Sequence, residues 1–256
     1  MSEFFIELFS EEIPANLQNK TRQDFFQNLK EFLEKEDIKY SGEATAFSIP
    51  NRLIVYFQNI SKKITKKENE IRGPNINAPE DALNGFLKSY KISIDKTYKK
   101  KTDKGEFYFF KKPSESIETK FVLQKNLPKI LDKTSWKKSM RWADHELYWG
   151  RPLKSILCCF DNKTLEFEYH HLVSSNITFI DKDFEQKTKK FVRFKDYLAF
   201  FRSQNIILDN KKREQFIVDQ LNRIAKKENL KIHFNSTLLN EVTNIVEKPN
   251  IIKCRF

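Results

Sequence analysis

The sequence predicts an α+β fold, in which a region of mixed strands and helices is followed by a helical portion. Short apolar runs typical of strands occur throughout residues 1–184, whereas helical periodicity prevails from about residue 185 onward. Strands and helices do not alternate regularly, which argues against a doubly wound parallel sheet. We therefore expect an α+β region over residues 1–184 and a helical region over residues 185–256, and we expect the helical region to continue into a further C-terminal part.

The first predicted strand is the apolar run Phe4–Phe9, which a single acidic residue interrupts. Glu11, Glu12 and Pro14 follow it and predict the start of a helix. Proline suits the first turn, and carboxylates are favoured at the positive end of the helix dipole. The helix is expected to run to about Glu34, with its apolar residues along one face.

The same patterns predict the remaining elements. Strands are expected at residues 44–48, 53–60, 106–111, 153–160 and 164–169, and helices at residues 81–90, 115–131, 191–202, 211–228 and 237–246. Asp161 and Asn162 favour a hairpin turn between two of these strands. A charged stretch at residues 62–70 predicts a solvated loop or edge, and Arg72-Gly73-Pro74 is expected to break the chain after it.

Composition indicates a globular protein with a basic surface. Apolar residues make up 39% of the 256 residues and charged residues 32%, which argues against disorder. The formal net charge of +12 suits a polyanionic partner, because each neutralised phosphate releases counterions. The alternative is that an AT-rich coding sequence supplies many lysines, which then spread over the surface and indicate no partner.

Several classes of protein are excluded by pattern. The cysteines at positions 158, 159 and 254 lack metal-ligand spacing, so we expect neither a metal site nor a disulfide framework. The N-terminus lacks the basic start of a signal peptide, and no apolar run approaches the ~20 residues of a membrane span. A cytoplasmic protein without a membrane partner is therefore expected.

The most distinctive segment covers residues 136–151. It contains the cationic residues Lys137, Lys138, Arg141 and Arg151 and all three tryptophans of the chain, Trp136, Trp142 and Trp149. Cations bind phosphates and planar rings stack on bases, so this mixture is typical of surfaces that bind single-stranded or looped RNA. The alternative is that the tryptophans belong to the core and the lysines are merely solvated.

Motifs of an enzyme active site are missing from the sequence. It contains no phosphate-binding loop, dinucleotide fingerprint, nucleophile elbow or zinc-protease motif. Glu11 and Glu12 are adjacent and diverge, so they are not expected to share a proton. We therefore expect no catalytic residue, no metal and no bound cofactor in this chain.

Six segments, in order along the chain, resemble one known family. They are FFIELFSEEIPA with Glu11, Glu12 and Pro14; IPNRLIVYFQNIS through Pro50, Arg52 and Leu53; the breaker Arg72-Gly73-Pro74; Ala82–Ser89 through Gly85 and Phe86; KKSMRWADHELYWGRPL at residues 137–153; and LLNEVTNIVEKP at residues 238–249. Together they resemble the β subunit of bacterial heterotetrameric glycyl-tRNA synthetase. A full β subunit is more than twice as long, so a further helical body and an anticodon-binding domain are expected to lie outside this chain.

The resemblance implies an aminoacyl-tRNA ligase of two α and two β subunits, which uses ATP and Mg²⁺ to attach glycine to tRNA-Gly. In that family the α subunit holds the adenylate-forming site, and the β subunit binds tRNA. Lys137, Lys138, Arg141 and Arg151 would then lie on a surface facing RNA or the α subunit, with Trp142 or Trp149 as a stacking residue. Two alternatives stay open: a hydrolytic editing-like module and a non-catalytic structural subunit.

Two departures from the family pattern affect this interpretation. Residues Leu172–Phe179 stand where the family has Gly-His-Arg-Phe, and the lost Arg would have been a bidentate phosphate donor. The role of that segment is therefore expected to be weakened or relocated. Ala143 replaces a family glycine, which is expected to be a milder change.

Overall fold

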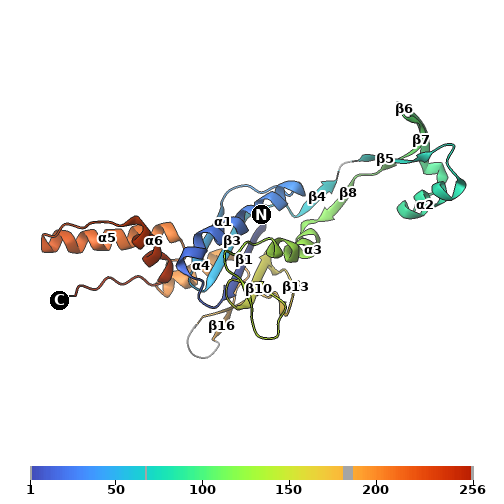
Figure 1. Cartoon of the computed structure of the whole chain (residues 1–256). Coiled ribbons are helices and arrows are strands. Elements are labelled where there is room, and N and C mark those ends of the chain that lie inside the picture. The colour runs from blue at the N-terminus through green and yellow to red at the C-terminus, as the bar shows by residue number, and fades with distance from the viewer. Residues whose placement is uncertain (1, 67, 181–186, 255–256) are drawn as a thin grey trace. The chain divides into compact units, whose positions relative to one another are not determined.

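A computed structural model describes residues 2–66, 68–180 and 187–254 (Figure 1). Strands, mostly in antiparallel sheets, are intermixed with helices along the chain, which confirms the predicted α+β fold. Contacts divide the chain into two compact units. Unit 1 comprises residues 1–62 and 119–256, and unit 2 comprises residues 63–118. The predicted boundary between residues 184 and 185 lies outside the described residues.

A five-stranded antiparallel sheet forms the centre of unit 1. Its order is β12 (Lys163–Thr164), β11 (Leu153–Phe160), β1 (Ser2–Ser10), β3 (Arg52–Ile60) and β2 (Ala44–Ile49). The predicted strand at the N-terminus is thus confirmed, and it occupies the middle of the sheet. Its residues are apolar on both sides because helices cover both faces, and Phe4, Phe5 and Ile6 are fully buried.

Two consecutive aromatic residues of β3 show how the two faces are covered. Successive side chains of a strand point to opposite faces. Phe57 stacks on Phe26 of helix α1 (Ala15–Lys35), with 5.4 Å between ring centroids. Tyr56 stacks on Phe194 of helix α4 (Phe194–Ser203), with 4.1 Å between centroids. Helix α1 therefore packs on one face of the sheet and α4 on the other.

The helices after residue 190 confirm the predicted helical portion and pack against the main sheet and α1. Helix α5 spans Asn210–Glu228 and α6 spans Ser236–Ile245. The buried Arg213 of α5 donates to the carbonyl of Ser48 in β2 at 2.9 Å and to that of Thr243 in α6 at 2.7 Å. These bonds join α5 to the main sheet and to α6.

Helix α3 (Thr119–Asp132) and several short strands complete unit 1. These strands are β9 (Met140–Arg141), β10 (Tyr148–Trp149), β13 (Glu168–Tyr169), β14 (Leu172–Val173), β15 (Ile177–Phe179) and β16 (Thr188–Lys190). The hairpin at Asp161-Asn162 is confirmed, because Phe160 pairs with Lys163 and both turn residues have positive φ. The strand expected at residues 164–169 is interrupted, since only its two ends pair.

Unit 2 contains a two-stranded ribbon, a three-stranded sheet and one α-helix. Strand β4 (Lys63–Lys66) pairs with β8 (Glu115–Glu118), and the sheet has the order β5 (Asn69–Asn75), β7 (Gly105–Lys112), β6 (Thr97–Thr102). Helix α2 (Glu80–Tyr90) is close to its predicted range, and a short 3-10 helix, η1 (Ile94–Lys96), follows it. The expectation that residues 115–118 begin α3 was wrong, because they form strand β8. The charged stretch 62–70 was expected to be a solvated loop or edge, and much of it lies in β4 and in β5, which is an edge strand of its sheet.

The segment Arg72-Gly73-Pro74 does not end a structural element as expected. It lies inside β5, where the pairing with β7 shifts between Arg72 and Asn75. A Cβ atom on Gly73 would lie 2.9 Å from the ring of Phe86 in α2. The absence of a side chain at Gly73 therefore lets Phe86 of α2 pack closely on β5. Pro74 is tolerated because β5 is an edge strand of the sheet.

Candidate nucleic-acid interface

The distinctive segment 136–151 contains the small hairpin β9–β10. Arg141 pairs with Tyr148, and Met140 pairs with Trp149. Directly opposite residues share a face of a ribbon, so Arg141 and Tyr148 lie side by side. Both are exposed, and the side chain of Tyr148 is among the most exposed large rings of the described chain, at 65%. The hairpin thus presents a cation beside an aromatic ring.

Tight packing of aromatic side chains fixes this hairpin on unit 1. Trp149 is only 2% exposed, and its ring centroid lies 5.1 Å from that of Trp136 and 6.2 Å from that of Tyr169. A Cβ atom on Gly150 would lie 2.2 Å from Cε3 of Trp136. Glycine is therefore required here so that the indole of Trp136 can lie on the backbone.

The three tryptophans differ in what they expose. Trp149 is buried and offers no face on which a base can stack, so it anchors the hairpin instead. Trp142 and Trp136 are half-buried, and their indole N–H groups have no acceptor among the described residues. Trp142 follows Arg141 directly and is not fully buried. The sequence did not single out Tyr148 as a stacking residue, because only the register of the hairpin shows that Tyr148, and not Trp149, is exposed.

The four predicted cations fall into two groups. Lys137, Lys138 and Arg141 are exposed and form no ion pair with any described residue. Arg151 is half-buried and donates from Nε to the carbonyl of Glu12 at 3.2 Å and from Nη1 to that of Gly150 at 3.3 Å. The first three are available to an anionic partner, whereas Arg151 holds the end of the hairpin against the β1–α1 connection.

The β1–α1 connection carries the predicted motif Glu11, Glu12 and Pro14. Its role at the helix start differs from the expectation. Helix α1 begins at Ala15 with Pro14 as its N-cap residue, so neither glutamate lies in the first turn. Glu11 forms an ion pair with Lys154, and its amide donates to the carbonyl of Pro152 at 3.0 Å. The motif therefore supports the strand that follows Arg151.

Arg52 belongs to a buried polar network in the main sheet. Its Nη1 lies 3.1 Å from Oε2 of Glu7 and donates to Oγ1 of Thr178 at 2.8 Å. Its guanidinium carbon lies 4.5 Å and 4.9 Å from the ring centroids of Phe9 and Phe201. Tyr197 and Thr178 both donate to the carboxylate of Glu7. Arg52 is therefore enclosed and acts in folding rather than in binding.

Two histidines stack beside the hairpin. The rings of His145 and His171 are 3.6 Å apart between centroids and inclined by 5°. Partial burial, with a smaller contribution from His145, lowers the pKa of His171. No group of three or more His, Cys, Asp or Glu side chains among the described residues is placed to hold a metal ion. Among the described helices, none has the length and apolar character that crossing a membrane requires.

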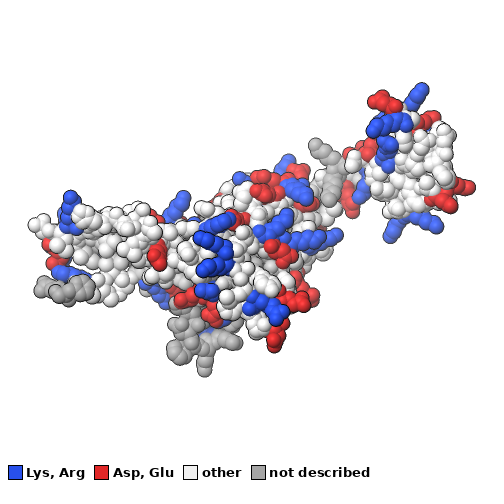
Figure 2. Space-filling model, in the orientation of Figure 1, with Lys and Arg blue, Asp and Glu red and all other residues white. Residues whose placement is uncertain are grey.

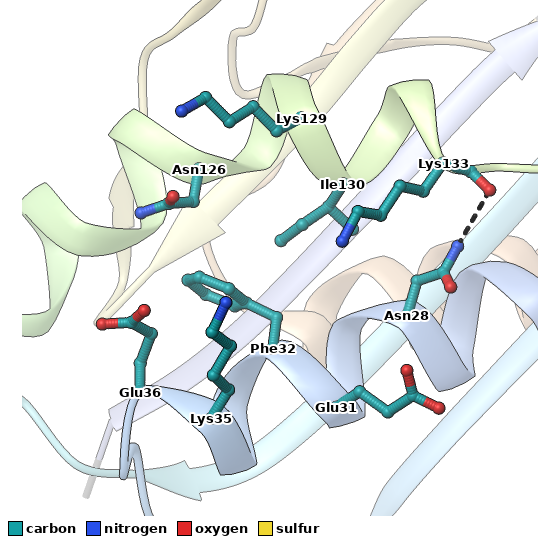
Figure 3. Close-up of a pocket in the computed structure, with 9 residues that line it drawn as sticks. All are labelled: Asn28, Glu31, Phe32, Lys35, Glu36, Asn126, Lys129, Ile130 and Lys133. Carbon is teal, nitrogen blue, oxygen red and sulfur yellow. Dashed lines mark hydrogen bonds between the residues drawn. The ribbon is translucent and has the colours of Figure 1, made fainter.

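A groove of about 350 Å³ lies between α1 and α3 (Figure 3). Phe32 and Ile130 form its apolar floor, and Asn28 donates to the carbonyl of Lys133 at 3.2 Å across one end. Three lysines and two glutamates line it together, namely Lys35, Lys129, Lys133, Glu31 and Glu36. This balance of charges does not favour a polyanion. Figure 2 likewise shows basic and acidic side chains interspersed over much of unit 1 on the face in view.

Comparisons with known proteins bear on the function of this interface. A family model described as glycyl-tRNA synthetase beta subunit matches residues 4–256. The glycine–tRNA ligase beta subunit of Rickettsia prowazekii (strain Madrid E) is 36% identical over 253 residues, which cover 98% of this chain and 38% of that protein. The protein of the same name from Rickettsia canadensis (strain McKiel) is 33% identical over 256 residues, which cover 100% of this chain and 38% of that protein. The chain thus spans 38% of the length of these curated relatives.

Proposed function

The chain belongs to the glycyl-tRNA synthetase beta subunit family, and from this membership we propose that it supports ATP-dependent attachment of glycine to tRNA-Gly. Its own task is to bind tRNA and a catalytic α subunit. The ATP and Mg²⁺ are used by the complex, and the adenylate-forming site is assigned to the α subunit. We assign a cytoplasmic complex of two α and two β subunits.

One observation supports the RNA-binding role most strongly, namely the pairing of Arg141 with Tyr148. A guanidinium reaches a phosphate in a forked geometry, and a phenol ring gives a flat surface for a base. Both side chains project from one face of the β9–β10 hairpin and are exposed. Lys137 and Lys138 precede the hairpin and add two exposed positive charges. Single-stranded or looped RNA needs this combination.

The hairpin is also held in place by contacts with other segments of unit 1, which matters for binding. The packing of Trp136 on Gly150 and the bond from Arg151 to Glu12 fix both of its ends on unit 1. A preorganised surface loses less conformational entropy when it binds. Trp142 stays a stacking candidate because the residue is only half-buried. Trp149 is left out of the proposed surface because it is buried.

The test is tRNA-Gly binding by the whole chain, measured by filter binding over a series of salt concentrations. Arg141→Ala is expected to weaken binding and to reduce the slope of log K against log[salt] by about 0.7–0.9, the value for one phosphate contact. Tyr148→Ala is expected to cost about 1–3 kcal/mol of binding free energy, and Tyr148→Phe to cost little, because the ring remains.

Arg223→Ala is the matched control, since it removes one exposed positive charge from α5. Equal effects of Arg141→Ala and Arg223→Ala would remove the hairpin from the RNA-binding surface. The partner subunit is tested by co-expression with an α subunit. Failure to co-purify would contradict the assignment of an α-subunit partner.

A further inference from the structure

Unit 2 contains a basic groove near the C-terminal end of helix α2. It lies between the C-terminal end of α2, η1 and the end of β7, and its volume is about 830 Å³. The residues that line it are Ser89, Tyr90, Lys91, Ile92, Lys96, Phe110, Lys111, Lys112 and Pro113. Four of these nine residues are lysines, and none of them is acidic. The α1–α3 groove of unit 1, by contrast, contains two glutamates.

The local sequence explains why this groove forms. Helix α2 ends at Tyr90, and Lys91 adopts a left-handed conformation with φ of 52°, which turns the chain back across the helix end. The amide of Ile92 then donates to the carbonyl of Leu87 at 3.1 Å. The ring of Tyr90 packs between Phe86 and Phe110, with centroid distances of 5.2 Å and 6.2 Å. One wall of the groove is therefore a fixed aromatic surface.

The lysines of this groove are available to a ligand. Lys91, Lys96 and Lys111 lie outside ion-pair distance of every described carboxylate, although Lys111 is paired across the sheet with Glu70 and Lys96 follows Asp95. Lys112 lies 3.6 Å from Glu115, in a pair whose side chains are both about half exposed. Such an exposed pair contributes little and is readily exchanged. The groove is thus positively charged and open to solvent.

Tyr90 supplies the second requirement for a nucleic-acid site. Its side chain is 42% exposed although its ring contacts two phenylalanines. A ring that is both held and exposed offers a face to a planar base, while the flanking lysines neutralise the phosphates on either side of that base. Four lysines favour an anionic ligand over an apolar one, and the exposed ring favours a ligand with planar groups.

We propose that this groove of unit 2 binds a single-stranded segment of RNA, with a base stacked on Tyr90 and the adjacent phosphates at Lys91, Lys96 and Lys111. The inference rests on the proposed function only in that tRNA is the natural source of the strand. It adds a second RNA contact, on a different unit from the β9–β10 hairpin.

The experiment measures binding of a 5′-labelled oligouridylate by the whole chain, using fluorescence anisotropy at several salt concentrations. The variant Lys91→Ala/Lys96→Ala/Lys111→Ala is expected to bind at least 10-fold more weakly, with the salt slope reduced by about 2, at roughly 0.7 per contact on a single strand. Tyr90→Ala is expected to weaken binding by roughly 5-fold to 150-fold, whereas Tyr90→Phe retains it. Circular dichroism confirms that each variant is folded.

The matched control is Lys211→Ala/Lys226→Ala/Lys227→Ala, which removes three exposed lysines from α5 and leaves the net charge of the chain equal to that of the groove variant. If both triple variants bind oligouridylate equally, the groove is not an RNA site. Competition by polyglutamate as strong as that by unlabelled oligouridylate would identify a general site for acidic partners and would also overturn the proposal.

A third comparison separates this inference from the proposed function. If Arg141→Ala and Tyr148→Ala leave tRNA-Gly binding intact while the groove variant weakens it, the proposal for the groove is supported and the assignment of the hairpin fails. If the groove variant binds both RNAs normally and the hairpin variants do not, only the groove proposal fails. A chain that binds neither RNA would overturn both.

Discussion

Nη1 of Arg52 lies 3.1 Å from Oε2 of Glu7, and the two side chains are 5% and 0% exposed. The pair joins neighbouring strands β3 and β1 at the centre of the main sheet. Thr178 donates to Glu7 and accepts from Arg52, so the network also holds β15, in the segment where the family's Gly-His-Arg is absent. Each charge is therefore stabilised mainly by the other members of this network.

We predict that Arg52→Met destabilises the fold by about 3–5 kcal/mol, because it leaves the carboxylate of Glu7 buried without its counter-charge. The free energy of unfolding, obtained from urea denaturation followed by circular dichroism, is the measurement. Lys154→Met is the control, since the ion pair of Lys154 with Glu11 is exposed and is expected to contribute less than about 1 kcal/mol. Equal losses in the two variants would mean that burial of the Arg52 pair has no energetic consequence.

A second prediction uses the coupling between the same two residues. Glu7→Gln removes the charge that Arg52 neutralises, so we expect the double variant Glu7→Gln/Arg52→Met to be less destabilised than the sum of the single variants. The interaction energy is expected to fall within about 0.5–3 kcal/mol, the range for contacting residues. Strictly additive losses would show that the two side chains act independently.

The close contact between Gly150 and Trp136 gives a third prediction. Gly150→Ala places a methyl group where Cε3 of Trp136 lies, at 2.2 Å from the new Cβ. Overpacking of this kind typically costs about 1–3 kcal/mol. We expect a lower melting temperature, a shift in tryptophan fluorescence and weaker tRNA-Gly binding, because the displaced indole anchors the hairpin.

The control for this substitution is Gly85→Ala in α2, where no atom lies within 4 Å of the added Cβ. Alanine is favoured over glycine in a helix by roughly 0.5–1 kcal/mol. The melting temperature should therefore stay the same or rise. A rise at both positions would mean that Trp136 moves aside without cost.

The conformation of Ala143 leads to the fourth prediction. Its φ is +48°, in the left-handed region that favours glycine, so the replacement of the family glycine is not the mild change that the sequence suggested. A Cβ atom there costs roughly 1–2 kcal/mol, and part of this is offset by the greater flexibility of unfolded glycine. Ala143→Gly is expected to stabilise the chain by about 0.5–1 kcal/mol in chemical denaturation. Ala199→Gly, at an exposed position inside α4, should do the opposite.

Most of unit 1 was predictable because its main elements follow a strand or helix pattern in the sequence, although α6 leaves Leu238 and Ile245 of its apolar face exposed. The apolar run of β1 and the helical periodicity of α1, α5 and α6 each specify an element without knowledge of its partners. Unit 2 was not predictable as a separate unit. In β4 only Ile64 is apolar, and its strand is defined by pairing with Ile117 of β8, far along the sequence. Patterns within a short window cannot reveal such a partner.

The sequence predicts which cations of the candidate interface are exposed, but not which aromatic rings are. Exposure of Lys137, Lys138 and Arg141 follows from their side chains, because isolated cations are rarely buried. Whether Tyr148 or Trp149 faces solvent depends on the register of a strand of two residues, and a shift by one residue would exchange them. That register is set by the packing of Trp149 against Trp136 and Tyr169, which belong to other segments.

The stacked pair His145 and His171 gives the last prediction, which concerns pH. Burial and the neighbouring His145 and His170 lower the pKa of His171, while the contact with the Leu153 backbone partly raises it. In the unfolded chain this group has the ordinary value of about 6.5. As the pH falls below that value, His171 becomes protonated in the unfolded chain before it does in the folded chain. The folding stability therefore decreases toward acid pH.

The pKa of His171 can be followed directly by NMR, through the pH dependence of its imidazole Cε1–H resonance. Removing the stacked neighbour by His145→Gln takes away one of the causes of the shift, so the midpoint of the His171 curve should move to higher pH. His233→Gln, which alters an exposed histidine on another part of the chain, is the control and should leave that curve unchanged. An unmoved midpoint in His145→Gln would show that the stacking of the two rings carries no electrostatic coupling and that the other causes set the pKa of His171.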